Sequence, residues 1–172
     1  TYGFSKVYAR GDGGSNPATL TIGPGITVHG TQGGESGGIN TGDSLINQGS
    51  IQADASGKTI TVSGANWTNE GVLKATNGGT LNISGATVSN AGHSIITDGG
   101  TVQLSNSTIT GGRIEDTVAG GSVSIGTAAL DGVVLDAHLT IPYMADLTVK
   151  NGLELNGTIT LADTNYSESR AP

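Results

Sequence analysis

Apolar residues recur along this chain at a constant interval. One series consists of Trp67, Val88, Ile109 and Leu130, whose numbers differ by 88 − 67 = 21, 109 − 88 = 21 and 130 − 109 = 21. A second series with the same interval consists of Ile60, Leu81, Val102 and Val123. Each member of the second series lies in a short segment of alternating polar and apolar residues, which is typical of a β-strand with one buried face. A unit of this size cannot bury its apolar residues alone, so the interval predicts that successive units stack on one another.

Glycine and asparagine follow the same repeat. Glycines recur at Gly49, Gly71, Gly92, Gly112, Gly132 and Gly152, with successive steps of 22, 21, 20, 20 and 20. A recurring glycine predicts a corner whose backbone dihedral angles other residues avoid. Asparagine precedes three of these glycines by two positions, at Asn47, Asn69 and Asn90. We expect these asparagines to stack as a ladder, with side-chain amides hydrogen-bonded from one unit to the next.

The repeat predicts an all-β fold, a single-stranded parallel β-helix or β-solenoid. We expect about 20–22 residues per coil, about three short strands in each coil, and roughly seven coils between Leu20 and Leu161. At a strand spacing of about 4.8 Å such a rod is about 35 Å long. A β-sandwich also has many short strands, but it has no reason to keep a constant offset through consecutive units. No helix is expected, because Gly, Thr or Val interrupts every stretch with helical spacing.

We divide the chain of 172 residues into three parts. Residues 1–18 form an N-terminal strand or cap segment, residues 19–162 the solenoid, and residues 163–172 a polar C-terminal tail. The glycine-rich stretch from Gly33 to Gly38 is expected to form a loop that protrudes from the rod. Between Val133 and Val149 the closer spacing and Pro142 predict a shorter coil with a proline-bearing corner.

Composition and charge exclude several classes of protein. Only 12% of the residues are charged, which is low for a globular domain, but the regular apolar alternation argues against a disordered linker. The net charge of −7 and the scattered Lys and Arg argue against a nucleic-acid partner. No apolar run approaches the roughly 20 residues of a transmembrane helix. Because cysteine is absent, packing and not disulfide bonds must stabilise the fold.

No catalytic set, metal site or cofactor is predicted, and we do not expect an enzyme. Four acids recur at roughly coil-like spacing, at Asp54, Asp98, Asp116 and Asp136. Their steps (98 − 54 = 44, 116 − 98 = 18 and 136 − 116 = 20) are too irregular to hold two carboxylates at the separation that glycoside hydrolysis needs. His29, His93 and His138 join no cluster with metal-ligand spacing. We interpret all seven as solvated surface groups.

Two short patterns point to binding. Arg10-Gly11-Asp12 matches a tripeptide read by integrins, but such a short match is a weak signal and precedes the repeat. A regular threonine array on a flat face favours ice binding, and the relevant pairs are Thr59/Thr61, Thr80/Asn82, Thr101/Gln103 and Ser122/Ser124. Because the array decays after one coil, we keep ice binding as a minor alternative.

Four phrases resemble the repeats of filamentous-haemagglutinin-like and autotransporter-passenger β-solenoids of bacterial surfaces. They run from Leu45 to Ile51, from Trp67 to Leu73, from Ala75 to Ile83 and from Leu155 to Leu161. The resemblance covers most of residues 20–161. It implies a right-handed parallel β-helix, secretion or display on the bacterial surface, and roles in adhesion, matrix or large surface assemblies. It implies no catalytic set.

The two ends of the rod differ in sequence. Three of the six aromatic residues lie close to the start of the chain, at Tyr2, Phe4 and Tyr8, and alternate as in a strand with one apolar face. The polar tail offers little apolar material to cover the last coil, which leaves an edge open to pairing. We hypothesise that the aromatic segment caps its own core or contacts the last coil of a second subunit. The rod then continues into further repeats or by head-to-tail stacking of copies.

The sequence therefore predicts a structural or adhesive extracellular β-solenoid, which serves as a stalk, an adhesin segment or a self-assembling filament subunit. The expected partners are further copies or repeats of the same kind, and surface glycans or a host receptor. The alternative is a carbohydrate-active β-helix enzyme or a polysaccharide-binding module, which the irregular spacing of the acids does not favour.

Overall fold

The computed structural model describes residues 5–13, 16–118 and 120–162, and the chain in these ranges consists of strands joined by short turns. No helix occurs in these ranges, so none is long and apolar enough to cross a membrane. The strands wind around three faces, which we call faces A, B and C.

Face A is the eight-stranded sheet, in the order β1 (Lys6–Ala9), β4 (Gly34–Gly38), β7 (Thr59–Ser63), β10 (Thr80–Ser84), β13 (Thr101–Ser105), β16 (Ser122–Ile125), β18 (His138–Pro142) and β20 (Thr158–Ala162). Face B is formed by β2 (Thr19–Ile22), β5 (Ser44–Asn47), β8 (Asn66–Asn69), β11 (Thr87–Ser89), β14 (Ser107–Thr110) and the first halves of β17 (Thr127–Asp136) and β19 (Asp146–Leu155). Face C is formed by β3 (Thr27–His29), β6 (Ser50–Ala53), β9 (Val72–Thr76), β12 (Ser94–Asp98), β15 (Arg113–Val118) and the second halves of β17 and β19.

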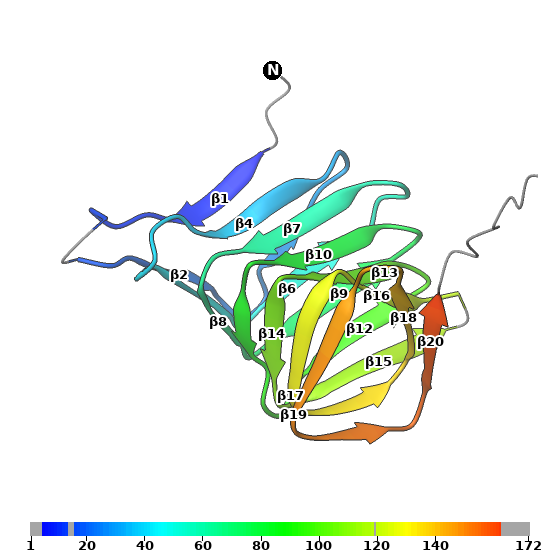
Figure 1. Cartoon of the computed structure of the whole chain (residues 1–172). Helices are drawn as coiled ribbons and strands as arrows, with labels where there is room; N and C mark the ends of the chain where they lie inside the picture. The colour runs from blue at the N-terminus through cyan, green and yellow to red at the C-terminus, as the bar shows by residue number, and fades with distance from the viewer. Residues whose placement is uncertain (1–4, 14–15, 119, 163–172) are drawn as a thin grey trace, which may run out of the picture.

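Each coil passes from face A to face B to face C, and the next coil repeats this path. All pairs of neighbouring named strands are parallel, so a strand always pairs with its counterpart in the next coil. Figure 1 shows the coils stacked in chain order, from β1 in blue to β20 in red. The result is a β-solenoid of about seven turns, which confirms the predicted fold class.

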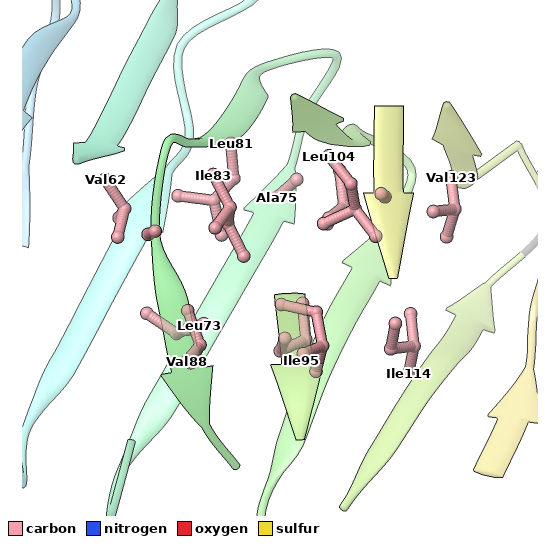
Figure 2. Packing of buried hydrophobic residues seen from close by; sticks show 14 of the residues in the cluster. Val62, Leu73, Ala75, Leu81, Ile83, Val88, Ile95, Leu104, Ile114 and Val123 are labelled. Carbon is pink, nitrogen blue, oxygen red and sulfur yellow. The ribbon is translucent and has the colours of Figure 1, made fainter. Parts of the chain in front are cut away.

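The core is a set of side-chain columns that run along the axis of the rod. Leu73, Ile95 and Ile114 are paired in this order along face C, and all three are fully buried. Figure 2 shows them in line, opposite Leu81 and Leu104 of face A. The core is only as wide as one coil, so each buried side chain rests on its counterparts in the coils before and after it.

Both apolar series of the sequence are columns of this core. Ile60, Leu81, Val102 and Val123 pair in succession on face A. Trp67, Val88, Ile109 and Leu130 pair in succession on face B. The constant interval of the sequence is therefore the length of one coil in this part of the rod. The Trp67 indole nitrogen donates a hydrogen bond to the backbone oxygen of Ser63 at 2.8 Å, so the one polar group in these two columns has a partner.

The glycine-rich stretch from Gly33 to Gly38 is not a protruding loop, and this prediction was wrong. It contains strand β4, which pairs with β1 on one side and β7 on the other. The glycines are required by close approach of the neighbouring backbone. A Cβ atom on Gly37 would collide with the backbone oxygen of Ser63. Ser36 takes the inward position between Val7 and Val62 and is fully buried.

The coil that follows Val123 is shorter than those before it. The numbers of the paired residues Val123 and Leu139 differ by 139 − 123 = 16, whereas those of Val102 and Val123 differ by 123 − 102 = 21. Ala137 alone joins β17 to β18, which removes most of the corner between faces C and A. Pro142 ends β18, and its backbone oxygen accepts a hydrogen bond from the Ala145 amide at 3.0 Å in the turn that follows.

We expect Gly37→Ala to destabilise the fold by about 1–3 kcal/mol, because the added methyl group meets backbone that can move only with strand β7. Gly23→Ala is the matched control, since a Cβ atom at Gly23 has no atom within 4 Å. Urea unfolding followed by circular dichroism compares the two. Equal midpoints would show that the approach of β4 to β7 does not require glycine.

Candidate functional site

The four recurring acids do not converge on one site. Asp54, Asp98 and Asp136 lie on or beside the outer side of face C, and each has its own basic partner. His29 Nδ1 lies 3.2 Å from Asp54 Oδ2, Lys74 pairs with Asp98, and Arg113 pairs with Asp136. The hydrogen bond and charge of the Lys74 ammonium hold the pKa of Asp98 below its ordinary value. These acids are partners of basic groups in neighbouring coils.

Asp116 differs from the other three acids in its inward position. It pairs in register with Thr97, which is fully buried, so both residues occupy the inward row at the corner between faces C and A. Asp116 Oδ1 is buried and has no hydrogen-bond partner in the described part of the chain. Asp98, the last residue of β12, lies nearby and accepts a hydrogen bond from the Thr117 hydroxyl at 3.3 Å, but it is on the outer side and pairs with Lys74. The two acids therefore do not form the facing pair that glycoside hydrolysis uses.

The three histidines belong to different parts of the solenoid. His29 ends β3 on face C, His93 lies in the corner before β12, and His138 begins β18 on face A. Within the described ranges no group of three or more His, Cys, Asp or Glu residues is arranged to hold a metal ion.

The Arg10-Gly11-Asp12 tripeptide lies in a loop that is tied to the second coil. Asp43, whose side chain is fully buried, accepts hydrogen bonds from the Gly11 and Ala18 amides at 3.0 and 2.8 Å. Its second oxygen accepts one from the Asn40 amide at 2.9 Å. The bonds from Ala18 and Asn40 contribute most to holding the pKa of Asp43 below its ordinary value. Asp12 itself is bonded to Asn16.

Sequence reasoning missed Asp43 altogether. The only local signal is an aspartate between a glycine and the first residue of strand β5, shortly after Asn40. This pattern is typical of a turn in which a carboxylate binds nearby amides. Its bonds to Gly11 and Ala18 join segments that are far apart in the sequence, which no local pattern indicates.

The asparagines stack through their amides at the corner between faces B and C. Asn47 Nδ2 donates to Asn69 Oδ1 at 2.8 Å, and Asn69 Nδ2 donates to Asn90 Oδ1 at 2.8 Å. Asn90 Nδ2 donates to the backbone oxygen of His93 at 3.0 Å. All donors therefore point toward the C-terminal end of the rod. Asn47 Oδ1 is left without a partner among the described residues, because Ile22 pairs with Asn47 in the first coil and offers no donor.

The glycine column has two different physical causes. Gly92, Gly112, Gly132 and Gly152 have positive φ angles of 79°, 71°, 63° and 95°, as predicted for a corner. Gly49 and Gly71 have no positive φ. A Cβ atom on Gly71 would collide with the backbone oxygen of Gly49, so close approach and not dihedral freedom requires glycine there.

Tyr8 lies on the outer side of face A and does not cover the core. Tyr8 pairs in register with Gly37, and Gly37 pairs with Ser63, whose side chain faces outward. The next residue of β1, Ala9, faces inward and is buried. The Lys6 ammonium lies 5.4 Å from the Tyr8 ring centroid and 3.1 Å from Glu35. Tyr2 and Phe4 lie outside the described residues.

The outer side of face A is rich in hydroxyl groups but irregular. Two outward threonines separated by one inward residue occur in β7 (Thr59 and Thr61) and in β20 (Thr158 and Thr160). Between these strands the same rows carry Asn82, Gln103 and His138. The outward rows are therefore no regular threonine lattice.

The last coil exposes the inward columns of the rod. Val149 and Leu155 are 48% and 46% exposed, whereas Leu130 and Leu135, their counterparts one coil earlier, are fully buried. Leu161 of β20 is 75% exposed. At the opposite end, Val7 is 47% exposed and Ile26 is 54% exposed. Apolar side chains thus lie uncovered at both ends of the described rod, and these ends are its candidate functional surfaces.

Comparisons with protein-family models, with curated proteins and with solved structures find no match to this chain. The structure itself shows a parallel β-solenoid, and the resemblance to bacterial surface repeats rests on the sequence phrases alone.

We expect Asn69→Ala to destabilise the fold by about 1–3 kcal/mol, because it leaves Asn90 Oδ1 buried without a donor. Ile22→Asn should extend the ladder by one step, since its amide would face the unpaired Asn47 Oδ1. The measurement is the free energy of unfolding in urea.

Ile22→Ala is the control for the ladder extension, because it removes the same apolar side chain without adding an amide. Ile22→Asn should be the more stable of the two. The ladder model is wrong if Ile22→Ala is the more stable, or if Asn69→Ala unfolds at the same urea concentration as the unmodified chain.

We expect the Gly11 and Ala18 amides to separate from Asp43 in acid. Since the pKa of Asp43 in the fold lies below its ordinary value of 3.8, its contribution to stability is present above that value. The contribution is lost as the pH falls through the lower pKa of the folded state. Hydrogen exchange at the Gly11 and Ala18 amides reports the bond directly. Asp43→Asn should raise both exchange rates at neutral pH. Unchanged rates would contradict the role of Asp43 in holding these two amides.

Proposed function

We propose that the chain is a structural segment of an exported bacterial surface protein, a rod that serves as a stalk or adhesin segment. The main support for this proposal is the continuity of the inward columns of apolar side chains. The apolar columns through Leu130 and Leu135 keep their character into the last coil, where Val149 and Leu155 are exposed although their counterparts in earlier coils are buried. Side chains in this arrangement are buried when a further coil stacks on them.

The arrangement of charges supports a structural role over an enzymatic one. On face C the acids pair with cations one coil away, so they tie coils together. A carbohydrate-active β-helix needs carboxylates that face a common groove. The extracellular location and the adhesive role are proposals supported by the resemblance of phrases such as Leu45 to Ile51 to surface repeats.

Duplication of one coil tests the structural role. A second copy of the segment from Thr80 to Gly100 inserted after Gly100 keeps the register, because Thr80 of β10 pairs with Thr101 of β13 in the next coil. We expect a folded chain that is longer by about 4.8 Å, the spacing of neighbouring strands. Small-angle X-ray scattering measures the added length, and circular dichroism measures the fold.

An insertion of the same residues in scrambled order is the matched control, because it adds equal length without the columns. A duplicated coil that unfolds the chain would contradict the proposal. So would turnover of acidic polysaccharides by the purified chain that is lost when Asp98 and Asp136 are replaced by asparagine.

A further inference from the structure

The two ends of the rod do not fit each other as they stand. In the described part of the chain face A has eight strands, whereas faces B and C each have seven, because the first described strand, β1, and the last, β20, both lie on face A. One face thus carries one strand more than the other two.

On faces B and C the two ends are complementary. Leu20 of β2 begins the column that ends with Val149, and Val28 of β3 begins the column that ends with Leu155. A second copy placed with its β2 and β3 beside β19 would continue both columns and bury the exposed Val149 and Leu155. The strands would be parallel, as they are throughout the rod, and would pair the free edge of β19.

The same placement produces a conflict on face A. With β2 of the incoming copy beside β19, its β1 falls at the level that β20 already occupies. Two strands cannot occupy one level of a sheet, so either β1 of the incoming copy or β20 of the receiving copy must leave.

Strand β1 packs less strongly on its neighbouring strand than β20 does. It has four residues, and its inward side chains Val7 and Ala9 rest on Ser36 and Gly38, which offer little apolar surface. Strand β20 has five residues, and its inward Ile159 and Leu161 rest on Leu139 and Ile141. Leu139 is almost fully buried beneath it. Removal of β1 therefore exposes less apolar surface than removal of β20.

We propose that β1 is a removable edge guard. In place on β4, it prevents a second copy of this chain from adding to the end of the rod. When β1 detaches, β4 becomes the first strand of face A and fits directly on β20, while β2 and β3 pair with β19. The resulting contact is a head-to-tail assembly of copies with all three faces in register. This inference rests on the proposed structural role of the rod.

The absence of cysteine from the chain allows a direct test in the full-length protein. Lys6 and Glu35 pair on the outer side of β1 and β4, so Lys6→Cys with Glu35→Cys can form a disulfide that locks β1 in place. The same variant under reducing conditions is its own control. Ala9→Asp loosens β1 by placing a charge at a buried position, and Lys6→Glu loosens it more mildly by removing the ion pair with Glu35.

Sedimentation velocity over a concentration series measures assembly, and circular dichroism verifies that each variant is folded. We expect the oxidised lock to stay monomeric and the loosened variants to assemble at about tenfold lower concentration than the unmodified chain. Adding Val149→Lys and Leu155→Lys to Ala9→Asp should restore the monomer, because both substitutions charge the receiving edge.

Two results would overturn the proposal. One is that Ala9→Asp and Lys6→Glu are both folded and remain monomeric. The other is that the oxidised and reduced forms of the lock assemble alike. Neither result affects the proposed structural role, which fails separately if a duplicated coil is not tolerated.

Discussion

The structure depends on one constraint, that each side chain stacks on its counterpart in the next coil. A parallel ladder at the spacing of neighbouring strands brings like residues together, so the column of Ile60 stays apolar as far as Leu139, even across the shorter coil. Polar residues follow the same rule at the corner of Asn47, Asn69 and Asn90, where identical side chains stack through their amides. Amides tolerate burial there because each is both donor and acceptor, and a stack of identical groups can satisfy nearly all of them.

This constraint explains why the fold was readable from the sequence. A column of like residues becomes a fixed interval along the chain, and that interval predicted the class, the coil length and the pairing of both apolar series. The same constraint explains the failures. Gly33 to Gly38 breaks the interval, and it was read as a loop because its glycines carry no apolar side chains. They form a strand because the neighbouring coils supply the pairing and leave no room for a side chain.

The sequence repeat could not predict interactions between a coil and an irregular segment. Asp43 binds the amides of Gly11 and Ala18, and nothing in the spacing of the columns indicates that contact. The outward acids illustrate a second limit. Asp98 and Asp136 were read as solvated turns, whereas each is paired with a cation of a neighbouring coil. Spacing reports which residues share a row, but the rotamer and length of a charged side chain decide which row it reaches.

A repeat also has no natural stopping point, so the ends of a solenoid require features that its coils do not contain. Edge strands in native sheets are shortened, charged or covered, and β1 has the first two of these properties, with four residues that include Lys6. In our proposal its position on a glycine-rich strand allows it to detach, because its partners Ser36, Gly37 and Gly38 give it little apolar surface to pack against. The unequal number of strands on the three faces then follows from geometry alone. The first and last strands of the described part both lie on face A, which leaves one extra strand there, and in our proposal that strand decides whether a further copy can add to the rod.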